Sequence, residues 1–163
     1  DGTSDVVLDD TYKEYLFTFN NIHPETNAVR LKFNVSIDAG SNYNVAKTTT
    51  MFNAYHDEGD AAAAIAYETG TDSAQGTGSE FLGSDVSNSN DSCMNGYLHI
   101  FNPASTTFVK HFISRAATLA NGEYAVDTHK AGYANTTSAV DAVQFSMSSD
   151  AIDAGDICLY GIK

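Results

Sequence analysis

The chain has 163 residues and a formal net charge of −13, because 21 acidic residues outnumber 8 basic ones. The basic residues are scattered, which argues against binding to nucleic acid or to an anionic membrane surface. No segment approaches the roughly 18 consecutive apolar residues of a membrane span. The length fits a single domain, residues 1–163. Because the sequence begins at Asp1 rather than Met, we expect a processed chain or the C-terminal module of a longer protein.

The first part of the chain predicts strands in close succession. Residues 6–8 favour a short edge strand, and alternating aromatic residues at 15–19 favour a longer one that ends at a turn over 20–24. Residues 29–37 alternate apolar and polar side chains most regularly, which is typical of a strand with one buried face. A further strand is expected at 47–56.

The second part continues the pattern around one long polar tract. Residues 60–67 are rich in alanine, and we favour a strand or a single helical turn there. The tract 69–92 predicts a long surface loop with one short strand at most, and we expect it to face partners because such loops often do. Strands are also expected at 124–128, 143–147 and 157–161.

Together these segments predict an all-β antiparallel β-sandwich of about eight to ten strands. A jelly-roll-like topology is favoured, since viral capsid and lectin domains often adopt it. The predicted core is the apolar phase of the alternating runs: Phe17, Phe19, Leu31, Phe33, Val35, Leu98, Ile100, Val109, Val143, Phe145 and Leu159.

Residues 94–115 predict a β-hairpin that is apolar on both faces. With a turn at 103–106, Phe101 pairs with Phe108 and Tyr97 with Phe112. One face then carries Leu98, Ile100, Val109 and Ile113, and the other carries Tyr97, Phe101, Phe108 and Phe112, with His99 and Lys110 between them. Either a loop such as 69–92 covers the aromatic face, or another chain does. We expect a homo-oligomer, with a trimer favoured.

Four segments resemble a poorly characterised family of virion structural proteins from marine tailed bacteriophages, including those of cyanobacteria. The segments are GYLHIFNPASTTFVKHFISR at 96–115, YNVAKTTTMFNAYHDE at 43–58, AGYANTTSAVDAVQFSMSSD at 131–150 and AGDICLYGIK at 154–163. The similarity runs from about Thr11 to the C-terminus, with the segments in the same order.

This resemblance implies a structural module of the virion, in a fibre, a tail or a capsid decoration, that docks on other virion proteins. It supplies no catalytic residues. A receptor-binding or glycan-binding module at a fibre tip is the alternative, with a host surface glycan as partner.

Catalytic and metal chemistry find little support in the sequence. No nucleophile motif, His-x-His pair or cofactor fingerprint occurs, so we expect no enzyme and no cofactor. Acidic clusters at 57–60, 150–156 and 9–10 are expected from composition alone, although one could hold calcium. Cys93 and Cys158 are interpreted as thiols, while a bridge between them stays conceivable. The register above places His99 and His111 on opposite faces of the hairpin.

Glycan binding has more support, because tyrosines can stack on sugar rings beside loops rich in asparagine. The candidates are Tyr43, Tyr55, Tyr67 and Tyr133. The absence of tryptophan weakens this hypothesis, and tyrosines that fill pockets and direct their hydroxyls to the rim explain the same pattern.

Overall fold

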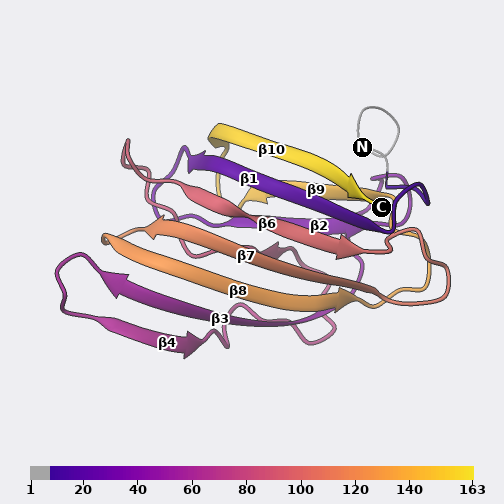
Figure 1. The fold of residues 1–163 in the computed structure, drawn as a ribbon, viewed down its shortest axis with the longest axis horizontal. Helices are drawn as coiled ribbons and strands as arrows, with labels where there is room; N and C mark the ends of the chain where they lie inside the picture. The colour runs from indigo at the N-terminus through magenta and orange to yellow at the C-terminus, as the bar shows by residue number, and fades with distance from the viewer. Residues whose placement is uncertain (1–7) are drawn as a thin grey trace.

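Two antiparallel sheets pack face to face in the computed structural model, which describes residues 8–163 (Figure 1). The larger sheet has the strand order β10-β1-β6-β7-β8-β3-β4 and the smaller one β5-β2-β9. The strands are β1 (Glu14–Pro24), β2 (Leu31–Ser36), β3 (Lys47–Asp57), β4 (Ala63–Tyr67), β5 (Glu80–Phe81), β6 (Met94–Phe101), β7 (Lys110–Ala120), β8 (Tyr124–Ala134), β9 (Ala142–Met147) and β10 (Ile152–Ile162). The predicted all-β antiparallel sandwich is confirmed, and its ten strands lie at the upper end of the expected number.

The chain passes repeatedly between the two sheets, as it does in jelly rolls. Along the chain, the strands of the smaller sheet (β2, β5 and β9) alternate with strands of the larger sheet. The larger sheet also contains a meander of three consecutive strands, β6, β7 and β8. The alanine-rich segment 60–67 forms the edge strand β4, and no helix occurs within residues 8–163. Consequently no helix in that range could cross a membrane. Of the edge strand expected at 6–8, Val6 and Val7 lie outside the described residues.

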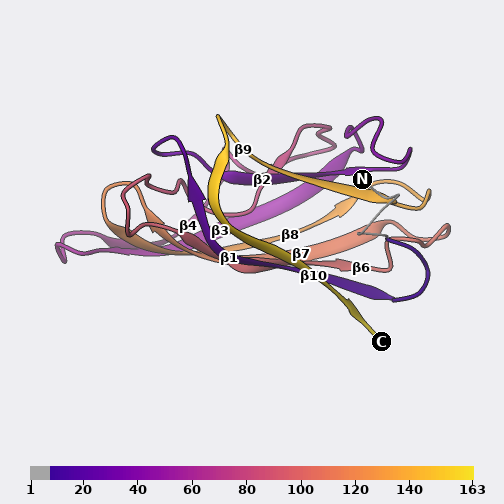
Figure 2. The same ribbon diagram turned by 90° about the horizontal axis from the view of Figure 1, so that it is seen from above.

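The core lies between the two sheets, on the faces that the alternating sequence pattern predicts. Phe17, Phe19 and Leu98 from the larger sheet pack with Leu31 and Phe33 from β2. Val35 and Ile100 are also buried, whereas Val143, Phe145 and Leu159 are partly buried against the core and Val109 lies outside the core cluster. Figure 2 shows β2 and β9 on one side of the larger sheet and no element of residues 8–163 on the other.

The smaller sheet covers only part of the larger one, and the polar tract covers the rest. β2 and β9 lie behind β1, β6 and β7 in Figure 1, and β2 meets β3 where the Asn34 side chain accepts from Lys47. Segment 68–80 first runs along the free edge of β3, where the backbone of Gly76 pairs with Lys47 and the Ser73 carbonyl accepts from the Thr49 amide. On the inner side of β8 the same segment is bonded to buried Lys130 through the Thr71 carbonyl and Glu80. The tract that we expected to face partners therefore serves in large part as a cover for the inner side of β3 and β8.

The predicted register of the β6–β7 hairpin is wrong by three residues. Ile100 pairs with Phe112, and Tyr97 pairs with Arg115. The connection runs over residues 102–109, because the Ser105 hydroxyl accepts hydrogen bonds from the amides of Thr107 and Phe108 and so holds them in a loop. An odd shift moves every side chain of β7 to the opposite face of the sheet.

The turn predicted at 20–24 is also wrong, since these residues continue β1. The pairing of β1 with β10 is irregular between Asn20 and His23, where Asn21 adopts a φ of 53°. This β-bulge bends the strand without ending it. Gly155 opposite has a φ of 111°, and a Cβ there would lie 2.6 Å from the Asn21 carbonyl oxygen, so only glycine fits.

Candidate docking surface

The side of the larger sheet that faces away from the smaller sheet, called the outer face below, is the main candidate for a functional surface. Its side chains form rows that run across the strands, because paired residues point to the same side. The central row, from β10 to β4, consists of Cys158, Thr18, Tyr97, Arg115, His129, Phe52 and Tyr67. All seven strands therefore contribute to one continuous surface.

The exposed large apolar side chains of the described chain gather on this face. Six of the eight belong to it: Phe52, Ile65, Tyr67, Ile113, Tyr160 and Ile162. Ile37 and Phe108 are the other two, and they lie outside the strands. Single exposed apolar residues are ordinary, but a contiguous group on one face is typical of a surface that binds another molecule.

The two ends of the outer face differ in side-chain size. On one side of the central row lie Tyr160, Leu16, His99 and Ile113, followed by Ile162, Phe101, His111 and Tyr133. On the other side lie Ala54, Ala117, Ala125 and Ala63, which line a shallow, mainly apolar depression of about 850 Å³ with Ile65, Leu119 and Cys93 at its border. We call these the bulky end and the alanine end.

Few acidic residues reach the outer face. Within residues 8–163, the acidic residues in its rows are Glu14, Asp127 and Asp156. Asp60 and Asp72 adjoin the face at one edge, where they contact His56 and Tyr67. Asp127 is paired twice: the guanidinium of Arg115 donates to both of its carboxylate oxygens, at 2.9 Å each, and His129 Nε2 lies 3.2 Å away. The bond from Arg115 and, to a lesser degree, that from His129 lower the pKa of Asp127.

Four of the five histidines occupy the outer face, at 56, 99, 111 and 129. The His129 ring stacks on Phe52, with ring centres 4.9 Å apart and planes nearly parallel. His99 and His111 share this face, which corrects the expectation that they lie on opposite sides of the hairpin. Among residues 8–163, no three His, Cys, Asp or Glu side chains are grouped so that they could hold a metal ion.

The four aromatic residues that we expected to form an oligomer contact do not lie together. Tyr97 and Phe101 lie on the outer face, in line with the expectation. Phe112 is 3% exposed and packs edge-on against Phe33 in the core, with ring centres 5.0 Å apart. Phe108 is 69% exposed in the loop 102–109. Lys110, which the same register placed beside the aromatics, is buried on the inner side.

Sequence reasoning missed most of the outer face. Phe52, Ile113 and Tyr160 were not recognised as its exposed members, and the alanine end was not foreseen. A signal did exist, since Ala117 and Ala125 occupy the phase of β7 and β8 that alternates with buried residues. Alanine at the outward positions of an alternating strand fits a face covered by another chain, but it also fits a face exposed to solvent.

The predicted glycan-contact tyrosines are dispersed over the molecule. Tyr67 and Tyr133 lie on the outer face. Tyr43 lies in the segment before β3, where its carbonyl accepts from Asn34. Tyr55 points to the inner side of β3 and meets Tyr124 edge-on, with ring centres 5.9 Å apart.

Tyr55 and Tyr124 do border a separate polar pocket of about 350 Å³. Much of the rest of the pocket wall consists of Arg30, Asn53, Glu68 and Asp85. Two aromatic rings beside amide, carboxylate and guanidinium groups are a set that can contact a sugar ring and its hydroxyls.

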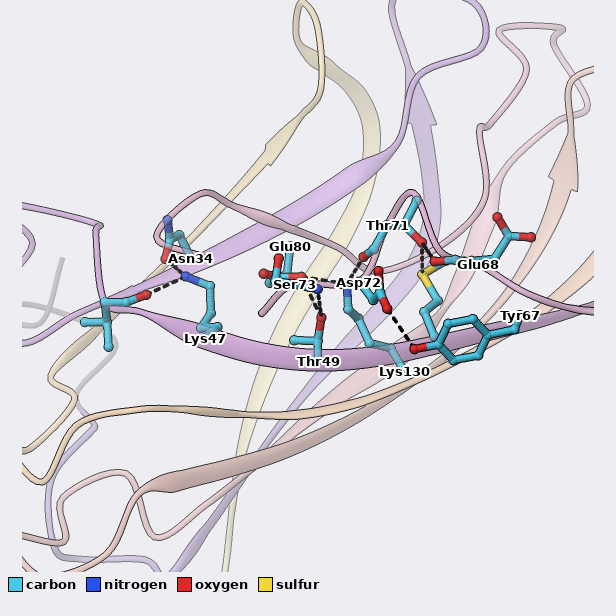
Figure 3. Close-up of polar contacts among 12 residues, drawn as sticks. Asn34, Lys47, Thr49, Tyr67, Glu68, Thr71, Asp72, Ser73, Glu80 and Lys130 are labelled. Carbon is cyan, nitrogen blue, oxygen red and sulfur yellow. Dashed lines mark hydrogen bonds and ion pairs between the residues drawn. The ribbon is translucent and has the colours of Figure 1, made fainter. Parts of the chain in front are cut away.

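Buried lysines form a second unusual feature, beneath segment 68–80 (Figure 3). Lys130 Nζ lies 2.7 Å from Glu80 Oε2 and donates to the Thr71 carbonyl at 2.9 Å. Thr49 donates to the same carboxylate oxygen at 3.1 Å. Desolvation lowers the pKa of Lys130, and attraction to Glu80 counteracts part of that effect. These bonds attach the segment to the inner side of β3 and β8.

Lys47 is buried nearby and bonded to two oxygens, Asn34 Oδ1 at 2.7 Å and the Val45 carbonyl at 2.8 Å. Burial lowers its pKa to about 8. A partly neutral lysine can act as a nucleophile, but this amine has no exposed surface. Its chemistry is therefore confined to the interior, where it satisfies acceptors beside the loop.

The acidic turns and the cysteines have local structural roles. Asp57 accepts from the amides of Ala61 and Ala62, and these bonds, led by that of Ala62, lower the pKa of its carboxyl. Cys93 and Cys158 are both free and half-buried, and both belong to the border of the outer face.

The chain matches no protein-family model, no curated protein and no solved structure. Fold and surface together define an all-β sandwich with one largely apolar sheet face that no element of residues 8–163 covers.

Proposed function

We propose that the chain is a non-enzymatic structural module of a bacteriophage particle, in a fibre, a tail or a capsid decoration, that works by docking its outer face on other protein chains. The gathering of six exposed large apolar side chains on one face is the observation that carries the proposal. Such a patch favours burial against protein, at roughly 25 cal/mol for each Å² of apolar surface removed from water. The phage assignment comes from the sequence resemblance of residues 96–115 and the three other segments.

Two further features support docking over catalysis. The most unusual ionisable group, Lys47, is enclosed in the interior and bonded to two acceptors. The depression at the alanine end is lined mainly by methyl groups, with His56, Asn95 and Asp127 as its only imidazole, amide and carboxylate side chains. That lining suits a packed side chain of another protein better than a reacting polar substrate.

The test is to follow an epitope-tagged copy of the chain in phage particles purified by density gradient, with gold-labelled antibody in the electron microscope. We expect label at one fixed place on the virion. The variant Ala125→Arg, which puts a charge on the outer face, should reduce incorporation, whereas Gln144→Arg, at an exposed position of β9 in the smaller sheet, should not. Particles that lack the chain altogether would contradict the proposal.

A glycan-binding function is the second candidate, and the pocket beside Tyr55 and Tyr124 favours it specifically. Isothermal titration with polysaccharide fragments from the host envelope tests it. Heat release that disappears in Tyr124→Ala would support glycan binding, and no heat with any fragment would leave docking as the sole function.

A further inference from the structure

We propose that the occupant of the outer face is a second copy of this chain, packed face to face across a two-fold axis that passes close to Arg115. This inference rests on the proposed function, because it names the partner of the same surface. Four properties of the outer face carry it: its charge, the different sizes of its two ends, its area and the residues at its centre.

Charge makes the outer face the place where two copies of this chain can meet. Each copy carries −13, and three of its eight basic residues, Lys47, Lys110 and Lys130, are buried. Most of the remaining surface is therefore acidic and repels a sister chain. Within residues 8–163, three acidic residues lie in the rows of the outer face and two more, Asp60 and Asp72, adjoin its edge. Of the three, Asp127 is neutralised by Arg115. A basic partner would instead be expected to face an acid-rich surface.

The two ends of the outer face complement each other in size. A two-fold axis perpendicular to the strands places the bulky end of one copy over the alanine end of the other, and it does so twice. Because this axis keeps each strand over its own copy, Ile113 then lies over Ala117 on β7, and Tyr133 lies over Ala125 on β8. Large and small side chains that interdigitate are what closely packed sheets require.

The area agrees with that of a stable interface. Seven strands spaced by about 4.8 Å, with a length of about 30 Å, give a footprint of roughly 900 Å² per copy. Two copies would then bury about 1,800 Å², which lies within the usual range of about 1,200–2,000 Å² for specific complexes. A single face that supplies both sides of the contact closes after two copies, since each face is then fully used.

The centre of the face is suited to burial. Arg115 lies on β7, the middle strand of the seven, and in the middle row. Because Arg115 and Asp127 satisfy each other through two hydrogen bonds, covering them leaves no unpaired charge. The copy of this pair from the other chain would lie beside it, with opposite charges able to alternate around the axis.

Sedimentation equilibrium of the isolated chain tests the inference. We expect a mass twice the 17.4 kDa of the chain at tens of micromolar. Association should tighten when salt is raised from about 0.02 to 0.5 M, because screening weakens the repulsion between two acidic copies. Ala125→Arg should weaken the dimer by at least about 30-fold, as expected for a charge placed within a packed interface.

Gln144→Arg is the matched control, since it introduces the same charge at an exposed position of β9 in the smaller sheet, away from the outer face, and it should leave the dimer unchanged. Thermal melting of both variants at submicromolar concentration verifies that they fold. A monomer or a trimer at tens of micromolar would overturn the inference, as would equal effects of the two variants. A chain that is monomeric in solution but still incorporated into particles would overturn the two-fold contact alone, whereas a dimer absent from particles would overturn only the proposed function.

Discussion

The guanidinium of Arg115 binds both carboxylate oxygens of Asp127 at 2.9 Å, from β7 to β8. The two residues are diagonal neighbours, since Arg115 is paired with His129 and Asp127 with Ala117. In the isolated chain the pair is partly exposed, and such pairs contribute only about 0–1 kcal/mol. If the face is covered by another chain, the pair allows both charges to be buried, because each then has the other as its partner.

Arg115→Ala should therefore separate folding from association. We expect a change below about 1 kcal/mol in the free energy of unfolding of the monomer. The dimer should weaken by at least about tenfold, because Asp127 would be buried without a partner. Urea unfolding at submicromolar concentration and sedimentation at tens of micromolar measure the two effects. The double variant Arg115→Ala, Asp127→Ala should dimerise more tightly than Arg115→Ala alone, because no lone carboxylate is then buried. If the double variant dimerised more weakly than the single one, the pair would not lie at the centre of the contact.

The buried pair of Lys130 and Glu80 should be essential for the cover over β3. Glu80→Leu leaves Lys130 charged in the interior, which should cost about 3–5 kcal/mol of stability. Lys130→Met combined with Glu80→Leu should cost less than the single change, because no lone charge remains. Urea unfolding gives these energies, and hydrogen exchange should show lost protection in segment 68–80. Equal costs for the single and double variants would contradict this account.

Lys47 should make stability rise with pH in the alkaline range. Its pKa is about 8 in the folded chain and 10.5 ordinarily, so between these values the unfolded chain binds the additional proton. Stability attributable to this group therefore increases as the pH rises from 8 towards 10.5, by up to about 1.4 kcal/mol per pH unit. The wild-type chain should gain stability over Lys47→Met in urea unfolding from pH 8 to 10. Parallel pH profiles for the two proteins would refute the lowered pKa.

Phe33 and Phe108 should respond in opposite ways to truncation. Phe33 is buried against Phe112, and Phe33→Ala should cost about 3–5 kcal/mol. Phe108 lies exposed in the loop, so Phe108→Ala should change stability by less than about 0.5 kcal/mol. Thermal and urea unfolding of both variants test the register of the hairpin. If Phe108→Ala lowered the free energy of unfolding by several kcal/mol, Phe108 would lie in a buried strand position, as in the register predicted from the sequence.

Strand positions could be predicted from the sequence where alternation is regular, as in β2, β3 and β9. The β6–β7 register could not, because Thr107, Phe108 and Val109 have strand-like side chains. Their placement in a loop depends on a single hydroxyl, that of Ser105, and on the Lys110 ammonium, which donates to the Phe108 carbonyl at 2.7 Å. Such contacts form only in the folded chain, so no local pattern indicates them.

The candidate surface was predictable only in outline. The apolar character of both hairpin faces predicted a second covered surface, but its members depended on the register. Buried lysines are also difficult to foresee, since Lys47 and Lys130 become acceptable only where Asn34, Glu80 and loop carbonyls reach them. These partners come from segments that are distant in the sequence, and their meeting is a property of the fold.

The most direct test of the central claim uses Cys93, which borders the alanine end of the outer face. In a Cys158→Ser background, the rate of its reaction with a bulky maleimide is measured from submicromolar to tens of micromolar protein. We predict that the rate falls as the bulky end of a second copy covers the depression, and that Ala125→Arg abolishes the fall while Gln144→Arg preserves it. A rate that is independent of protein concentration in the parent chain would contradict the docking of a second copy on this face.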